Sequence, residues 1–171
     1  MILNIKQTEQ PFSGEYKEKI YDIASPWNTS DWTWIRFEEE FSTWYGEFRG
    51  KYRGVVFSEK IGIIVVVTSD YIYVLDIQTK EIIDYKGQPE FIDITSTPFG
   101  DILVSDGYGL EKFKGNTISS LEPIILPVNA DSLKFIEYRN KILEMKCGEL
   151  WNWTNHDTLL LDCESMEVIK R

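Results

Sequence analysis

The stretch YVLDIQTKEII, residues 73–83, decides how this chain is expected to fold. Apolar residues fill its first positions, Asp76 follows them, and branched residues resume at Ile82. An Asp at the end of a strand can accept backbone N–H groups in a turn, and a Thr or Ser hydroxyl three residues later supports the same turn. Thr79 stands at that position. The stretch therefore predicts two strands joined by a tight turn.

The same pattern returns as LLLDCESMEVI in residues 159–169, which align with residues 73–83 without a gap. Leu75, Asp76, Glu81 and Ile83 are matched by identical residues, namely Leu161, Asp162, Glu167 and Ile169. The second stretch starts at residue 159 and the first at residue 73, an offset of 86 residues. This offset equals two units of about 43 residues, the size expected of a four-stranded repeat.

Short runs rich in Val, Ile, Tyr and Phe, separated by turn residues, fill the chain from about residue 51 onward. Such runs are typical of β-strands. They fall into three repeats, at about 51–88, 89–128 and 129–171. The predicted fold is mostly all-β, built from antiparallel four-stranded repeats. The expected strands are 54–58, 61–68, 71–76, 81–85, 90–95, 101–106, 109–113, 117–121, 132–138, 141–147, 158–163 and 166–170.

The hairpin VLDIQTKEII, residues 74–83, resembles the last hairpin of a β-propeller blade, as in WD-type repeats. The resemblance covers Lys51 to Arg171, but the Gly-His and Trp-Asp pairs of the WD family are missing. Because three blades cannot close a ring, it implies an open, half-propeller-like stack of sheets. A β-sandwich or meander with hairpins that are similar by chance is the alternative.

The first 50 residues are expected to cap this array, so that residues 1–171 form a single domain. Aromatic residues at helical spacing predict one short helix near residues 37–48. They are Phe37, Phe41, Trp44, Tyr45 and Phe48. We expect Phe37, Phe41 and Phe48 to be buried, since bare sheet ends are normally covered. Alternation of residues 32–37 predicts a short strand before the helix.

Two segments combine acidic residues with tryptophan, a residue that is over-represented at binding hot spots. We predict that both bind a partner protein, and that the tryptophans of the first are exposed. The alternative for each segment is a structural role in the core or against the sheet. The predicted partner-binding residues are Trp32, Trp34, Glu38, Glu39, Glu40 and Trp44 in the first segment, and Trp151, Trp153 and Asp157 in the second.

A net charge of −10 disfavours direct contact with nucleic acid or an anionic membrane and favours a basic protein as partner. Solubility alone is the commoner reason for such a charge. The N-terminus lacks a signal-peptide pattern, and the apolar run Ile61–Val67 is too short to span a bilayer. We therefore expect a cytoplasmic protein with Cys147 and Cys163 as reduced core thiols, and we favour a monomer.

Sequence signals of catalysis are weak. His156 is the only histidine, and the common metal, phosphate-loop and nucleophile motifs are missing. Cys147 and His156 stand at an arbitrary spacing, and Asp101 and Asp106 are better explained as turn formers than as calcium ligands. We expect no enzyme activity, no cofactor and no metal. The 28 acidic residues leave a carboxylate-based hydrolase open, because their spacing selects no pair.

In overall character, DWTWIRFEEE (31–40) followed by RGVVFSEKIGIIVVVTSDYIYVLD (53–76) resembles the immunity proteins of bacterial polymorphic-toxin and contact-dependent inhibition systems. The resemblance implies a small protein that binds a cognate toxin, commonly a basic nuclease, and blocks its active-site cleft. It assigns no residue roles, since these proteins share no motif. The alternative is a β-repeat scaffold or regulatory module that binds host proteins.

Overall fold

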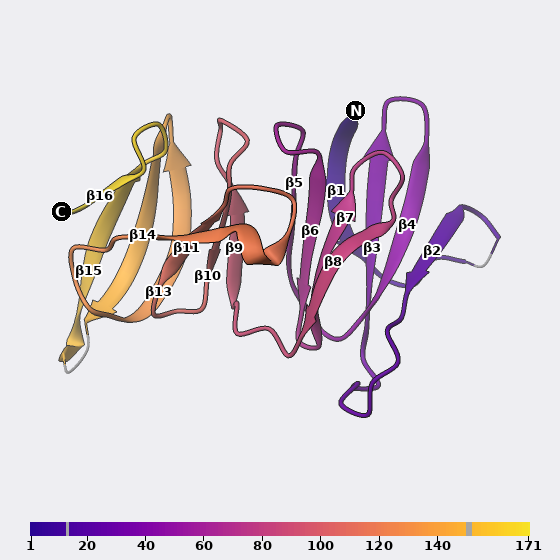
Figure 1. Ribbon diagram of the computed structural model, residues 1–171, viewed down its shortest axis with the longest axis horizontal. Coiled ribbons are helices and arrows are strands. Elements are labelled where there is room, and N and C mark those ends of the chain that lie inside the picture. The colour runs from indigo at the N-terminus through magenta and orange to yellow at the C-terminus, as the bar shows by residue number, and fades with distance from the viewer. Residues whose placement is uncertain (13, 150–151) are drawn as a thin grey trace.

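A computed structural model describes residues 1–12, 14–149 and 152–171 (Figure 1). Its strands form four sheets of four strands each. Sheet A contains β1 (Ile2–Thr8), β2 (Lys17–Tyr21), β3 (Trp32–Glu39) and β4 (Thr43–Arg49). Sheet B contains β5 (Tyr52–Ser58), β6 (Ile63–Thr68), β7 (Tyr71–Asp76) and β8 (Ile82–Gly87).

Sheet C contains β9 (Asp93–Ser96), β10 (Ile102–Ser105), β11 (Leu110–Phe113) and β12 (Leu121–Ile124), with the short 3-10 helix η1 (Ile118–Ser120) before β12. Sheet D contains β13 (Ala130–Arg139), β14 (Ile142–Glu149), β15 (Asn152–Asp162) and β16 (Glu167–Lys170). Within the described residues, no helix is long and apolar enough to cross a membrane.

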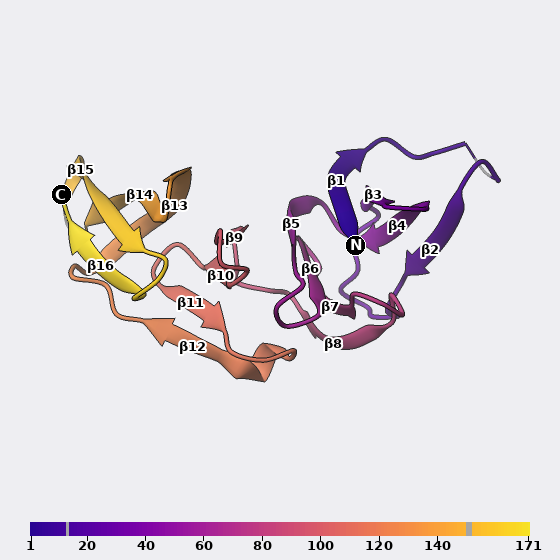
Figure 2. The same ribbon diagram turned by 90° about the horizontal axis from the view of Figure 1, so that it is seen from above.

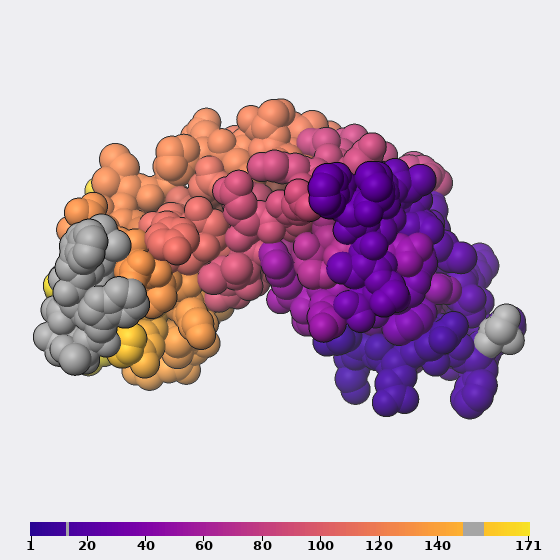
Figure 3. Space-filling view, turned by 90° about the horizontal axis from the view of Figure 1, so that it is seen from below, coloured from indigo at the N-terminus to yellow at the C-terminus, as the bar shows by residue number. Residues whose placement is uncertain are grey.

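The four sheets stand side by side along an arc (Figure 2). The first strand of each sheet, β1, β5, β9 or β13, lies on the concave side, and these strands contact one another in turn. The last strands in sheet order, β2, β8, β12 and β16, lie on the convex side. The space-filling view shows the open concave side (Figure 3). The expected propeller-like, all-β fold is confirmed, and the sandwich alternative is wrong.

The predicted helix near residues 37–48 is wrong, because these residues form β3, a turn and β4. In β3, Thr33, Ile35 and Phe37 alternate toward the core and are almost fully buried. Phe48 and Trp44 of β4 lie opposite Thr33 and Phe37 on the same face. Two strands of a hairpin thus produced a spacing of aromatic residues that mimics a helix.

The burial of Phe41 was also wrongly predicted. Phe41 lies in the turn between β3 and β4 and is 93% exposed, whereas Phe37 and Phe48 are buried as expected. A turn residue belongs to neither face of the sheet, so the alternation that buries Phe37 and Phe48 does not reach it.

The first 50 residues form a complete fourth sheet whose strand order differs from that of the others. Sheets B, C and D run from one edge to the other in chain order, whereas sheet A has the order β1-β3-β4-β2. Its edge strand β2 pairs parallel to β4, while the other strand pairs are antiparallel. The segment between β1 and β3 therefore supplies the convex edge of sheet A.

Each pair of neighbouring sheets encloses its own hydrophobic core. Ile64 and Val66 belong to the core between sheets A and B, and Val65 and Val74 to the core between sheets B and C. All four are fully buried. Residues 63–67 are all apolar because neighbouring sheets cover both faces of β6. Alternate residues of β6 thus face two different cores.

A third core, between sheets C and D, holds Cys147 and Cys163, both buried. Burial raises the pKa of the Cys163 thiol.

The two matching hairpins have the same turn geometry. The Asp76 carboxylate accepts the N–H groups of Gln78 and Thr79 at 2.8 and 2.7 Å. The Asp162 carboxylate accepts those of Glu164 and Ser165 at 2.8 and 3.3 Å. These backbone hydrogen bonds lower the pKa of both carboxyl groups. The prediction that the two aspartates occupy equivalent turns is confirmed.

The residue four positions after the aspartate is Lys80 in one hairpin and Met166 in the other. Its φ is positive in both, 63° and 61°. Left-handed backbone at one fixed position is a further sign that the two turns are equivalent.

Candidate partner-binding surface on sheet A

The N-terminal end of the arc carries the tryptophans of the first predicted site. Because the buried residues of β3 are Thr33, Ile35 and Phe37, the residues between them point away from the core. These are Trp32, Trp34, Arg36 and Glu38, each partly exposed. Trp32 and Trp34 therefore lie on one face, as their alternation in the sequence predicted.

The neighbouring strands extend this face. In β4, Tyr45, Glu47 and Arg49 stand opposite Arg36, Trp34 and Trp32. In β1, Asn4, Lys6 and Thr8 stand opposite Glu38, Arg36 and Trp34. We name these ten residues, Asn4, Lys6, Thr8, Trp32, Trp34, Arg36, Glu38, Tyr45, Glu47 and Arg49, the outer face of sheet A. It combines aromatic rings with charges of both signs.

Arg49 holds the ring of Trp32 in place. Its guanidinium lies 3.8 Å from the centre of that ring, a cation–π contact. The same group donates two hydrogen bonds to the Asp22 carboxylate, at 3.1 and 2.8 Å. The hydrogen-bonded Asp22 raises the pKa of Arg49. The Trp32 surface is therefore ordered before any partner arrives, which lowers the entropic cost of binding.

Three polar atoms on this face are buried without a hydrogen-bond partner: Thr8 Oγ1, Trp34 Nε1 and Arg36 Nε. Thr8 and Trp34 are directly paired across β1 and β3, and Arg36 follows two residues after Trp34 on the same face. Buried polar groups are normally satisfied by protein or by water. All three atoms are shielded from solvent, so a bound molecule could reach them only if these side chains moved.

The three glutamates predicted to act together are separated by the strand. Glu38 lies on the outer face, 2.9 Å from Arg36. Glu39 points the other way and forms an ion pair with Lys80 of sheet B. Glu40 is exposed in the turn. The three glutamates therefore do not form one continuous acidic patch.

Glu39 is bound within the protein. Burial raises the pKa of its carboxyl group, but hydrogen bonds from Lys80 and Ser42 outweigh this, and the net pKa is lowered. Its carboxylate is thus engaged in joining sheets A and B.

Trp44 lies on the core side of β4. It is 6% exposed and its ring stacks on Phe37, with ring centroids 4.1 Å apart. In contrast to the prediction of an exposed tryptophan, Trp44 belongs to the core between sheets A and B. The cause is its position opposite Phe37 in the hairpin, a register that the sequence does not display.

The second predicted site lies in sheet D, at the other end of the arc (Figure 1). Trp151 is outside the described residues. Trp153 lies in β15, but its side chain is outside the described part of the structure. Asp157 forms an ion pair with Lys170 at 2.7 Å. Asp157 therefore lies at the opposite end of the arc from the outer face of sheet A.

Arg36, Tyr45 and Arg49 were missed by the sequence analysis. The alternation of side chains in β3 could have predicted Arg36, because every second residue of a strand lies on the same face and Arg36 follows Trp32 and Trp34 at that spacing. Tyr45 and Arg49 need the register of the β3–β4 hairpin. That register was hidden by the helix-like spacing of the aromatic residues.

The outer face of sheet D has a different composition. Lys134 pairs with Lys146, and Glu137 with Glu144, on the face opposite the buried Leu143 and Met145. On the described part of this end, these charged pairs share the face with the aliphatic side chains of Leu160 and Ile169. In the described residues, no group of three or more His, Cys, Asp or Glu side chains could hold a metal ion.

Comparisons with known proteins show a structural likeness only. No protein-family description matches the chain, and no curated protein matches its sequence. Among solved structures, it is similar to the N-terminal domain of Nup159, with 16% sequence identity and a TM-score of 0.47. That match covers 71% of this chain and about a third (34%) of the solved domain's chain.

Proposed function

We propose that this protein is a protein-binding module that holds its partner on the outer face of sheet A. The observation that carries the proposal is the composition of that face. Trp, Tyr and Arg are the residues most enriched in binding hot spots, and the partly exposed Trp32, Trp34 and Arg49 lie together there. The ordered Trp32–Arg49 pair supports the same assignment.

The partner that we propose is a bacterial toxin, and the protein acts as its immunity protein in the cytoplasm. A net charge of −10 supports a basic partner such as a nuclease, because opposite charge speeds the encounter of two proteins. The role is stoichiometric blockade of the toxin's cleft, without catalysis. The attraction comes from the whole surface, since Glu38 and Glu39 are each engaged with a basic side chain.

The test is protection of cells that express the product of the adjacent gene. We expect the wild-type protein to restore growth and the Trp32→Ala/Trp34→Ala variant to restore it poorly. Trp27→Ala is the matched control, because Trp27 is 73% exposed and lies outside this face. Growth inhibition that the wild-type protein does not relieve would exclude the immunity role.

A second candidate function is a scaffold for several host proteins. The repeated sheets favour it, since stacked repeats create extended surfaces with separate binding positions. Affinity purification separates the two functions. An immunity protein should recover one partner in equimolar amount, and a scaffold should recover several.

A further inference from the structure

The convex edges of neighbouring sheets are joined in different ways along the arc. Between sheets A and B, side chains from the Asp76 turn reach across to the preceding sheet. Glu81 pairs with Lys19 of β2 at 2.5 Å, and Lys80 pairs with Glu39. The Tyr21 hydroxyl also donates to the Lys80 carbonyl at 2.8 Å. Charge pairs thus link the two sheets at this junction, beside a smaller pocket of about 290 Å³ lined by Lys19, Trp44 and Lys80.

Between sheets B and C, a segment of the chain fills the corresponding position. The connection from β11 to β12 carries η1, which contacts β8. The Ile118 N–H donates to the Asp84 carboxylate of β8 at 2.9 Å, and the Ile118 side chain packs on the core between the two sheets. This junction is closed by a peptide segment bearing an aliphatic side chain.

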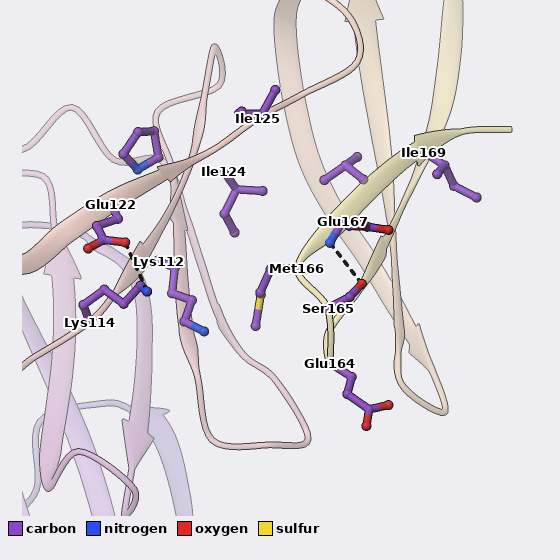
Figure 4. A pocket seen from close by; sticks show the side chains of 12 residues that line it. Lys112, Lys114, Glu122, Ile124, Ile125, Glu164, Ser165, Met166, Glu167 and Ile169 are labelled. Atoms are coloured by element: carbon purple, nitrogen blue, oxygen red, sulfur yellow. Dashed lines mark hydrogen bonds and ion pairs between the residues drawn. The ribbon is translucent and has the colours of Figure 1, made fainter.

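Between sheets C and D, the corresponding position is an open groove of about 710 Å³ (Figure 4). Ile124 and Ile125 line one side, and Met166, Val168 and Ile169 line the other. Ile125 and Ile169 are 89% and 60% exposed. The connection from β15 to β16 is the short Asp162 turn, which does not fill the groove as the η1 segment fills its own junction.

The charged residues of the groove pair within their own sheets. Lys114 pairs with Glu122 at 3.2 Å in sheet C, and Glu164 pairs with Lys141 at 2.8 Å in sheet D. Glu167 is exposed and lines the groove.

The internal repeat shows what this groove would accept. Lys80 and Met166 hold the same turn position, and so do Glu81 and Glu167. In the first hairpin, Glu81 meets a lysine from the neighbouring strand β2. In the second, Glu167 is exposed at the groove, and Met166 offers an apolar contact in place of the charge of Lys80.

We propose that this groove docks an extended peptide segment of a partner protein, in which a Lys or Arg meets Glu167 and an adjacent branched aliphatic side chain meets Met166 and Val168. The segment takes the role that Lys19 has between sheets A and B and that Ile118 has between sheets B and C. The site is separate from the outer face of sheet A, and its test does not depend on the toxin.

The probe is a displayed library of random ten-residue peptides, followed by a fluorescent synthetic copy of the most enriched sequence. We expect the enriched peptides to share a basic residue beside a branched aliphatic one. Glu167→Lys should weaken binding at least tenfold at low salt, with a smaller effect at high salt. Ile169→Glu should weaken it similarly, and both changes lie at exposed positions that do not threaten folding.

The matched controls are Glu59→Lys and Ile136→Glu, which make the same changes at exposed positions outside the groove. Both control variants should bind the peptide with an affinity within twofold of the wild-type value. Failure to enrich any shared sequence, or equal binding by Glu167→Lys and Glu59→Lys, would overturn the proposal. So would a wild-type dimer in sedimentation that Ile169→Glu converts to monomer, since a second copy would then occupy the groove.

Discussion

At the residue scale, the Asp-turn is the feature that the sequence predicted best. Asp76 and Asp162 each accept two backbone N–H groups, and each is followed at the fourth position by a residue with positive φ. These contacts are local, so an Asp followed three residues later by Thr or Ser is enough to predict them. The environment of Trp44 depends on strand pairing, and the sequence did not predict it.

Replacing both aspartates with alanine should lower the urea midpoint at neutral pH. The folded state lowers the pKa of each carboxyl group, so each stabilises the fold above its unfolded pKa. That stabilisation is lost as the pH falls below about 4 toward the lower folded pKa. The difference between wild type and the Asp76→Ala/Asp162→Ala variant should therefore shrink in acid. A difference that is constant from pH 7 to pH 3 would contradict the role of these hydrogen bonds.

At the element scale, the strands from residue 51 onward could be predicted because their apolar runs are bounded by turn residues. The strands within residues 37–48 could not be predicted, because β3 and β4 place aromatic residues at intervals that also suit a helix. The parallel addition of β2 to β4 is a long-range pairing with no local signal. This is why the fourth sheet was expected to be only a cap.

The central strand β6 should tolerate truncation poorly. Ile64 and Val66 are fully buried between sheets A and B, so Ile64→Ala and Val66→Ala should each cost about 2 kcal/mol or more. Urea titration measures this cost. Ile82→Ala, at a position that is 36% exposed on the edge strand β8, should cost clearly less. Equal midpoints for all three variants would contradict the proposed core.

Close approach of β5 and β9 on the concave side should depend on Gly54. A Cβ atom at this position would lie 2.3 Å from Ile94 Cγ2, so Gly54→Ala forces the two strands apart. We expect a loss of about 1–3 kcal/mol, as for other overpacked sites. Removing the obstacle with Ile94→Ala should make the double variant more stable than the sum of the single effects predicts. Gly109→Ala, where the nearest atom is 3.7 Å away, is the control.

At the scale of the whole molecule, the four sheets form an open array with two unlike ends. The outer face of sheet D combines charged pairs with the aliphatic Leu160, whereas the outer face of sheet A gathers Trp32 and Trp34 beside Arg36 and Arg49. The sequence indicated that the first 50 residues carry a binding surface. It could not show which of their side chains share a face, because this depends on the direction and register of β3 and β4.

Surface plasmon resonance against the product of the adjacent gene tests this assignment most directly. If the outer face of sheet A holds the partner, Trp34→Ala should raise the dissociation rate about 30-fold, equivalent to about 2 kcal/mol, and leave the association rate within threefold. Trp27→Ala should leave both rates unchanged. The account would be contradicted if the partner dissociated from correctly folded Trp34→Ala and Trp32→Ala variants as slowly as from the wild type.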